Sequence, residues 1–164
     1  MALVTRFEDL QAWQEARRLA ARAFEITQLS GFRRDRNLVD QLRRASVSAM
    51  NNIAEGFDSG SHNEFGRFLR YAVRSASEVQ SCLYVAIDRG YIGHDLFGEI
   101  YESARRVKSF SSALLQRVST RPARRSTGEG MVKEDASEWP SRPIHPGCYT
   151  SAPPHLRTSA RSIP

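Results

Sequence analysis

Proline is missing from the first part of this chain. The sequence has 164 residues and seven prolines, and every proline lies after residue 120. Because proline removes a backbone donor and clashes with the preceding helical turn, the first part permits long helices and the second does not. The second part is also poor in large apolar residues, so burial cannot offset the entropy of ordering it. We therefore predict a helical domain over residues 1–119 and a disordered tail, rich in Pro, Ser and Arg, over residues 120–164.

Cysteine and long apolar runs are also scarce. The two cysteines, Cys82 and Cys148, are far apart and lack the spacing of metal ligands, which argues against a disulfide scaffold and fits a reducing compartment. No apolar run approaches the length of a membrane span or of the core of a signal peptide. The sequence predicts a soluble cytoplasmic protein without membrane association.

Lysine is nearly absent from a basic chain. The formal net charge is +6, and Lys108 and Lys133 are the two lysines, so arginine supplies the rest of the positive charge. The forked guanidinium group suits phosphate and carboxylate partners better than an ammonium group does. A genome that favours arginine codons would produce the same bias, and composition alone does not separate the two explanations.

Three segments carry one apolar stripe each at helical spacing. In the third segment the stripe lies within about 40° of one line on a helix of 3.6 residues per turn. Ser61 and Glu64 predict a capping box at its start, and Gly90 predicts its end. The second segment is predicted to end at Gly56, and its polar Asn52 is expected to bond to Ser75. The stripes are Leu38, Leu42, Ala45, Ala49 and Ile53; Phe65, Phe68, Leu69, Ala72, Ala76, Val79 and Leu83; and Leu96, Ile100, Val107, Phe110, Leu114 and Val118.

The first segment, from about Asp9 to Leu29, carries two apolar stripes. Leu10, Trp13, Ala20 and Phe24 form one, and Ala12, Leu19, Ala23 and Ile26 form the other. A helix that is apolar on two sides needs two partners, so Leu19 and Ile26 are predicted to lie in an oligomer interface. The alternative is a helix that is simply more buried than the others. Thr5 and Glu8 predict a capping box before it.

Four such helices joined by short loops are typical of an antiparallel up-down bundle. We therefore predict an all-α fold, a four-helix bundle followed by the tail.

Four short motifs resemble a known family. They are Phe7-Glu8-Asp9-Leu10-Gln11-Ala12-Trp13, Gln41-Leu42-Arg43-Arg44-Ala45-Ser46-Val47-Ser48, Asn52-Ile53-Ala54-Glu55-Gly56-Phe57 and Glu64-Phe65-Gly66-Arg67-Phe68-Leu69. In this order they are similar to the four-helix bundle family encoded within intervening sequences of bacterial 23S rRNA genes. The resemblance covers about residues 5–118 and does not extend to the tail.

The resemblance implies an up-down bundle that assembles as a ring-like homopentamer. It also implies a relation to the accessory protein of diversity-generating retroelements, which binds nucleic acid through a basic surface and associates with a reverse transcriptase. Position by position, Arg43 and Arg44 match the family's paired arginines, and Arg67 and Arg70 match basic positions of the third helix. The residues that match the family's central motif are Asn52, Ile53, Ala54, Glu55 and Gly56. The chain departs from the family pattern at Asp58, His62 and Asn63, where relatives often have basic residues, and at Ala49-Met50-Asn51, where a proline is common.

Arginines of the third segment form the predicted nucleic-acid-binding face. Arg67, Arg70 and Arg74 lie within an arc of about 60°, a spacing that lets them contact one strand of phosphates. Arg43 and Arg44 are added from the second segment. Two alternatives stay open: the third-segment arginines only solvate the surface, and the second-segment pair forms salt bridges with Glu55, Glu64 or Glu78.

Enzymatic motifs are not found. No histidine lies three residues after a glutamate, as the di-iron sites of four-helix bundles require, and no phosphate loop or nucleophile motif occurs. We predict a non-enzymatic, homo-oligomeric adaptor that binds RNA or DNA backbone, with a partner enzyme such as a reverse transcriptase. No catalytic residue, cofactor or metal is predicted. The alternative is a structural or protein-interaction bundle with no nucleic-acid role.

Overall fold

The computed structural model describes residues 4–119. The main elements are α1 (Gln11–Ile26), α2 (Arg36–Asp58), α3 (His62–Asp88) and α4 (His94–Ser119), and the short 3-10 helices η1 (Phe7–Asp9) and η2 (Phe32–Arg34) precede α1 and α2. The predicted all-α class is confirmed for this part of the chain. The predicted disordered tail, residues 120–164, lies outside the described residues.

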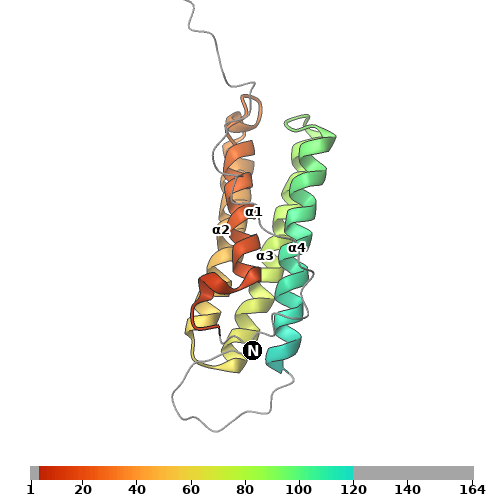
Figure 1. Cartoon of the computed structure of the whole chain (residues 1–164). Coiled ribbons are helices and arrows are strands. Elements are labelled where there is room, and N and C mark those ends of the chain that lie inside the picture. Colours follow the sequence, from red (N-terminus) through yellow and green to blue (C-terminus); the bar gives the residue numbers. More distant parts are fainter. Residues whose placement is uncertain (1–3, 120–164) are drawn as a thin grey trace, which may run out of the picture. The chain divides into compact units, whose positions relative to one another are not determined.

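The four helices pack as an up-down bundle (Figure 1). α2 packs against α3, α3 against α4, and α1 against both α2 and α4. The α1–α2 and α3–α4 connections lie at one end of the bundle and the α2–α3 turn lies at the other, so consecutive helices run antiparallel. This is the arrangement that short connections favour.

The core is formed by the predicted stripes of α2, α3 and α4. All stripe residues of α2 are buried, and in the other two helices all are buried except Phe68, Leu96 and Phe110, which are partly buried. Since a period of 3.6 residues places these side chains on one side of each helix, burial against the neighbouring helices follows directly from the spacing. The predicted positions are confirmed.

The prediction for α1 was wrong about its second stripe. Leu19 is 0% exposed and Ile26 is 3% exposed, so both side chains lie in the bundle's own core and neither is available as an oligomer interface. Phe24, which belongs to the other stripe, is 42% exposed. The physical reason is that α1 contacts two helices, α2 and α4, which together cover a wide arc of its surface. The alternative of a more deeply buried helix was therefore correct.

The start of α1 also differs from the prediction. The helix begins at Gln11 after η1, and Leu10 is its N-cap without any side-chain hydrogen bond to the backbone. Glu8 pairs with Arg6, whose Nη2 lies 2.7 Å from the Glu8 Oε1, so the predicted box with Thr5 does not form.

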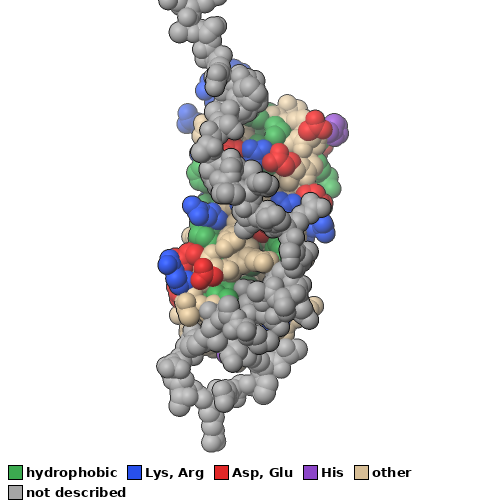
Figure 2. Space-filling model, in the orientation of Figure 1, with side chains coloured by type: hydrophobic (Ala, Val, Ile, Leu, Met, Phe, Trp, Pro, Cys, Tyr) green, Lys and Arg blue, Asp and Glu red, His purple; other side chains and the backbone are tan. Residues whose placement is uncertain are grey.

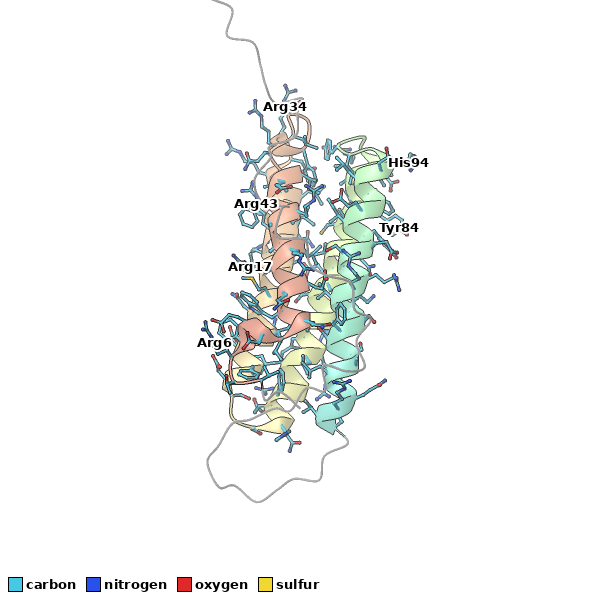
Figure 3. The ribbon with its side chains drawn as sticks, viewed as in Figure 1. Arg6, Arg17, Arg34, Arg43, Tyr84 and His94 are labelled. Atoms are coloured by element: carbon cyan, nitrogen blue, oxygen red, sulfur yellow. The ribbon has the colours of Figure 1, made fainter. Side chains whose placement is uncertain are left out.

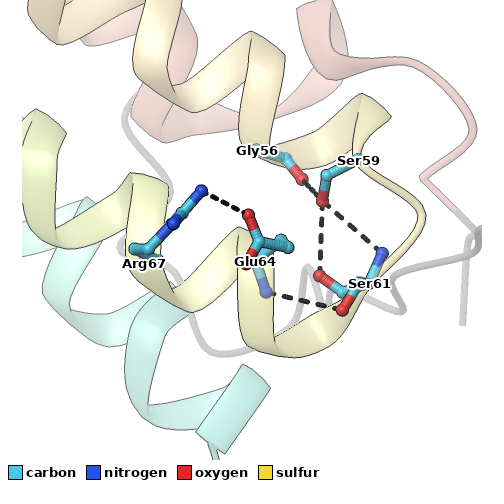
Figure 4. A network of polar contacts seen from close by, with 5 residues as sticks. All are labelled: Gly56, Ser59, Ser61, Glu64 and Arg67. Carbon is cyan, nitrogen blue, oxygen red and sulfur yellow. Dashed lines mark hydrogen bonds and ion pairs between the residues drawn. The ribbon is translucent and has the colours of Figure 1, made fainter.

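The ends of α3 follow the sequence signals closely (Figure 4). The Glu64 N–H donates to Ser61 Oγ at 3.5 Å, but the Glu64 carboxylate pairs with Arg67 at 2.6 Å, so half of the predicted capping box forms. At the other end Gly90 has a φ of 68°. Its N–H donates to the Ile87 carbonyl, and the Tyr91 N–H donates to the Ala86 carbonyl, both at 2.9 Å. These paired bonds are a Schellman motif, which requires a left-handed residue and therefore favours glycine.

The predicted end of α2 at Gly56 was wrong. The helix continues to Asp58, and Gly60, with a φ of 66°, makes the turn into α3. Gly56 is buried against α3. A Cβ at this position would lie 2.7 Å from the Phe68 Cβ and 2.8 Å from the Phe65 Cδ2, which is too close for a side chain. Contact with another helix, rather than a break in the backbone, accounts for this glycine.

Candidate functional site

An open groove crosses α2, with Phe24 of α1 lining its first part and residues of α3 lining its second part. It consists of two adjoining hollows of about 470 and 450 Å³ that share Ser48 and Asn52. We call it the α2–α3 groove. The first hollow is lined by Phe24, Arg43, Arg44, Val47, Ser48, Asn51, Asn52 and Glu55, and the second by Ser48, Asn52, Tyr71, Arg74, Ser75 and Glu78.

A hydrogen-bonded trio links the two hollows. Asn52 Nδ2 donates to the Ser48 carbonyl at 2.7 Å and to Ser48 Oγ at 3.1 Å. The hydroxyls of Ser48 and Ser75 are 3.0 Å apart. Asn52 therefore reaches the predicted Ser75 through Ser48 rather than directly. Its Oδ1 has no hydrogen-bond donor among residues 4–119, so this acceptor is left for the groove.

Arg43 is held in a fixed orientation at the edge of the first hollow (Figure 3). Its Nε donates to Thr27 Oγ1 at 2.9 Å, and Thr27 Oγ1 donates to the Phe24 carbonyl at 2.8 Å. Its Cζ lies 4.7 Å from the centroid of the Phe24 ring. Within the described residues, neither Nη atom of Arg43 has a partner. The side chain is thus held by a hydrogen bond and a ring contact while both terminal amino groups remain available.

Arg44 is exposed and lines the same hollow. The predicted alternative, salt bridges from Arg43 or Arg44 to nearby glutamates, is not found among residues 4–119. Glu64 pairs with Arg67, and Glu78 accepts a hydrogen bond from Gln41 at 3.3 Å.

The arginines of α3 divide between two places. Arg67, Arg70 and Arg74 are all exposed, as the spacing predicted. Arg74 lines the groove, whereas Arg67 pairs with Glu64 and lies over the Phe68 ring at 5.6 Å. Arg70 lies near Gly66, on the side of α3 that faces Leu115 of α4. The groove therefore brings together Arg43, Arg44 and Arg74, while Arg67 and Arg70 lie elsewhere on α3.

The family-motif residues have separate roles. Asn52 and Glu55 line the groove, Ile53 and Gly56 are buried, and Ala54 is partly buried. Most of the motif therefore serves the packing of α2.

Phe24, Thr27 and Tyr71 are among the residues of this region that sequence reasoning missed. Tyr71 had a usable signal, since it follows Arg67 by four residues and precedes Arg74 by three, and such neighbours share one helix face. Phe24 and Thr27 had none, because their contact with Arg43 joins two helices.

An aromatic cluster marks a second surface, between α3 and α4. The Tyr84 ring centroid lies 5.1 Å from that of Phe97 and 5.8 Å from that of Tyr101. Tyr84 is 52% exposed and the nearby Val85 is 45% exposed. In Figure 3 Tyr84 and Arg43 project from opposite sides of the bundle, so this cluster is separate from the groove.

Between α1 and α4 two pairs of opposite charges are in contact. Arg22 of α1 lies 2.8 Å from Glu99 of α4, and Arg106 of α4 lies 3.3 Å from Glu15 of α1. Figure 2 likewise shows basic and acidic side chains beside one another on the visible face.

Cys82 lies buried in α3. Burial raises the pKa of its thiol to about 11, so it is a poor nucleophile near neutral pH. Over residues 4–119, His, Cys, Asp and Glu side chains form no cluster suited to a metal ion. None of the helices described here has both the length and the apolar character of a membrane span.

Comparisons with known proteins identify the family from the sequence and the fold from a solved structure. A family model described as 23S rRNA-intervening sequence protein matches residues 8–113. A solved structure, that of a protein of unknown function from the S23 ribosomal protein family of Bacteroides thetaiotaomicron, aligns with a TM-score of 0.60 at 19% identity. The alignment covers 64% of this chain and 95% of that one, and at this identity it supports the fold alone. No curated protein matches the sequence.

Proposed function

Because the chain belongs to the 23S rRNA-intervening sequence protein family, we propose that it is a non-enzymatic, homo-oligomeric adaptor that binds RNA or DNA backbone through its arginine-bearing helices. The observation that carries the proposal is the set of arginines on α2 and α3 that lack a carboxylate partner among residues 4–119. These are Arg36, Arg43, Arg44, Arg70 and Arg74, of which Arg43, Arg44 and Arg74 line the α2–α3 groove.

Arginine without a neighbouring carboxylate suits phosphate. A paired guanidinium must give up its partner before it binds an anion, whereas an unpaired one gives up only water and counterions. Contacts to phosphate position a nucleic acid without reading its sequence. The proposal therefore expects binding that is strongly salt-dependent and nearly independent of sequence.

Assembly and partners are part of the same proposal. The family resemblance supports a homopentamer, and the two widely separated cysteines support a cytoplasmic location. The relation that the resemblance implies to the accessory protein of diversity-generating retroelements supports a partner enzyme such as a reverse transcriptase. A ring of subunits would repeat the arginine surface and raise affinity through multivalency.

The test is fluorescence anisotropy with labelled RNA and DNA over a series of salt concentrations. We expect Arg44→Glu with Arg74→Glu to weaken binding strongly and to reduce the salt slope by about 0.7–0.9 for each phosphate that the protein no longer neutralises. Arg105→Glu with Arg106→Glu is the matched control, because it changes the net charge equally but alters α4, where Arg105 pairs with Glu102 and Arg106 with Glu15. No binding at low salt, or equal losses in both variants, would contradict the proposal.

The aromatic cluster favours a second candidate, a bundle that binds protein. Tyr84 and Val85 are exposed on α3, and Phe97 and Tyr101 extend this apolar surface onto α4. Exposed aromatic side chains of this kind are enriched in protein interfaces. Sedimentation distinguishes this function: Tyr84→Glu with Val85→Glu should dissociate an oligomer or release a partner while leaving nucleic-acid binding intact. A wild-type monomer that captures no partner would exclude it.

A further inference from the structure

The α2–α3 groove combines a fixed cation with groups that suit a nucleobase. Arg43 is held by Thr27 and by the Phe24 ring, and both of its Nη atoms remain available. A planar fork that is already oriented loses less entropy when it binds a phosphate than a free side chain does. The edge of the first hollow is therefore preorganised for one phosphate, with Arg44 beside it.

Hydrogen-bonding groups line the same hollow as this cation. Asn51 and Asn52 line the first hollow, and the amide of Asn52 is oriented by its two bonds to Ser48. Asn52 Oδ1 offers a hydrogen-bond acceptor, and the exposed amide of Asn51 offers both a donor and an acceptor. These groups match the hydrogen-bonding edges of unpaired bases.

Aromatic rings flank the groove on both sides. Phe24 is 42% exposed and Tyr71 is 39% exposed, and each lines one of the two hollows. Phe24 carries Arg43 on its ring, and Tyr71 is held edge-on by Phe68, with ring centroids 6.1 Å apart. Such supported rings are platforms for stacking, and stacking needs a base that is not already paired in a duplex.

Two carboxylates also lie in the groove, Glu55 and Glu78. They repel a continuous row of phosphates, but a carboxylate accepts a hydrogen bond from the exocyclic amino group of a base. The mixed charge thus favours a nucleotide that turns its base into the groove and its phosphate toward Arg43.

We propose that the α2–α3 groove seats an unpaired nucleotide of a single-stranded nucleic acid, with its phosphate on Arg43 and Arg44 and its base against Tyr71. This inference rests on the proposed function and narrows it, because the outer arginines of α3 alone would bind single strands and duplexes alike.

The experiment compares the full chain on labelled single-stranded oligonucleotides and on a duplex of the same length. We expect tighter binding of the single strand, and we expect Tyr71→Leu to weaken that binding by about tenfold, the value of one base stacked on one aromatic ring. Tyr71→Phe should restore it, and duplex binding should not change. Tyr84→Leu is the matched control, since Tyr84 is also an exposed tyrosine of α3 but lies outside the groove.

A second variant tests the phosphate seat. Arg43→Lys keeps the charge but loses the fork and the Thr27 bond, so single-strand affinity should fall while the salt slope stays the same. If the duplex binds as tightly as the single strand, or if Tyr71→Leu has no more effect than Tyr84→Leu, the groove inference is overturned and backbone binding by the adaptor stands. If neither nucleic acid binds at low salt, the proposed function fails as well.

Discussion

Replacing Gly56 by alanine tests how closely α2 approaches α3. The new Cβ would lie 2.7 Å from the Phe68 Cβ and 2.8 Å from the Phe65 Cδ2. The Phe68 Cβ is bonded to the α3 backbone, so rotation of a side chain does not relieve the contact and the two helices must separate. Because Gly56 is buried against Phe65, the separation also disturbs the core around that ring.

The magnitude follows from two opposing effects. Alanine stabilises a helix interior by about 1 kcal/mol relative to glycine. Overpacking a well-packed core costs about 1–3 kcal/mol. The helix effect is common to all glycines inside these helices, so a comparison between glycines isolates the packing cost. We expect Gly56→Ala to be less stable than Gly98→Ala by about 1–3 kcal/mol, since a Cβ at Gly98 meets nothing within 4 Å.

The assay is urea unfolding of the full chain followed by far-ultraviolet circular dichroism, with thermal melts as a second measure. A change of 1 kcal/mol corresponds to about 4 °C in Tm for a domain of this size. Gly66→Ala provides an intermediate case, because its Cβ would lie 3.3 Å from the Leu115 Cδ1, the mobile end of a side chain. From the most to the least stable variant, the expected order is Gly98→Ala, then Gly66→Ala, then Gly56→Ala.

One result would refute this reasoning. If Gly56→Ala were as stable as Gly98→Ala, α2 and α3 would not be in the close contact described, and the placement of the groove between them would also be in doubt.

Three further predictions concern the core, a cap and a thiol. Leu19→Ala should lower the free energy of unfolding by about 2–5 kcal/mol, measured by urea unfolding. Leu29→Ala, at a side chain that is 37% exposed, should change the same free energy by less than about 1 kcal/mol, and equal effects would contradict the burial of Leu19. Asp35→Ala should cost about 1 kcal/mol in the same assay, because Asp35 Oδ1 caps α2 at the Leu38 N–H and Oδ2 accepts from the Tyr91 hydroxyl, and Asp35→Asn should retain most of that stability. In a Cys148→Ser chain, the buried Cys82 thiol, whose pKa is raised to about 11, should react with a thiol reagent at pH 8 only after denaturation, and rapid labelling of the native chain would be the contrary result. The stability that the neutral Cys82 thiol contributes is complete below its ordinary pKa of 9.0 and is lost as pH rises through about 11.

The groove and the family motif meet at the same part of α2. Asn52 and Glu55 face the groove while Ile53 and Gly56 fix α2 against α3. The motif thus brings α2 close to α3 through Gly56 and supplies polar groups to the groove through Asn52 and Glu55. Variants at Gly56 and at Asn52 should therefore separate packing from binding.

Local signals in the sequence were sufficient for the helices and much of their packing. The stripes of α2, α3 and α4 predicted the core because burial on one side of a helix repeats every 3.6 residues. Gly90 predicted the end of α3 because a left-handed residue is a property of a few consecutive positions. The exposed face with Arg67, Arg70 and Arg74 followed from the same periodicity.

Contacts between distant segments required the tertiary structure. Arg43 was recognised as a candidate, but its partners Thr27 and Phe24 belong to the end of α1 and the residue after it. The two apolar stripes of α1 did not show which side faces the core, since that depends on the positions of α2 and α4 around it. Gly56 was predicted to end a helix because the sequence does not distinguish a glycine that ends a helix from a glycine that lets two helices pack closely. The periodicity of one helix is local, whereas the space left for a side chain is decided by the helices that pack against it.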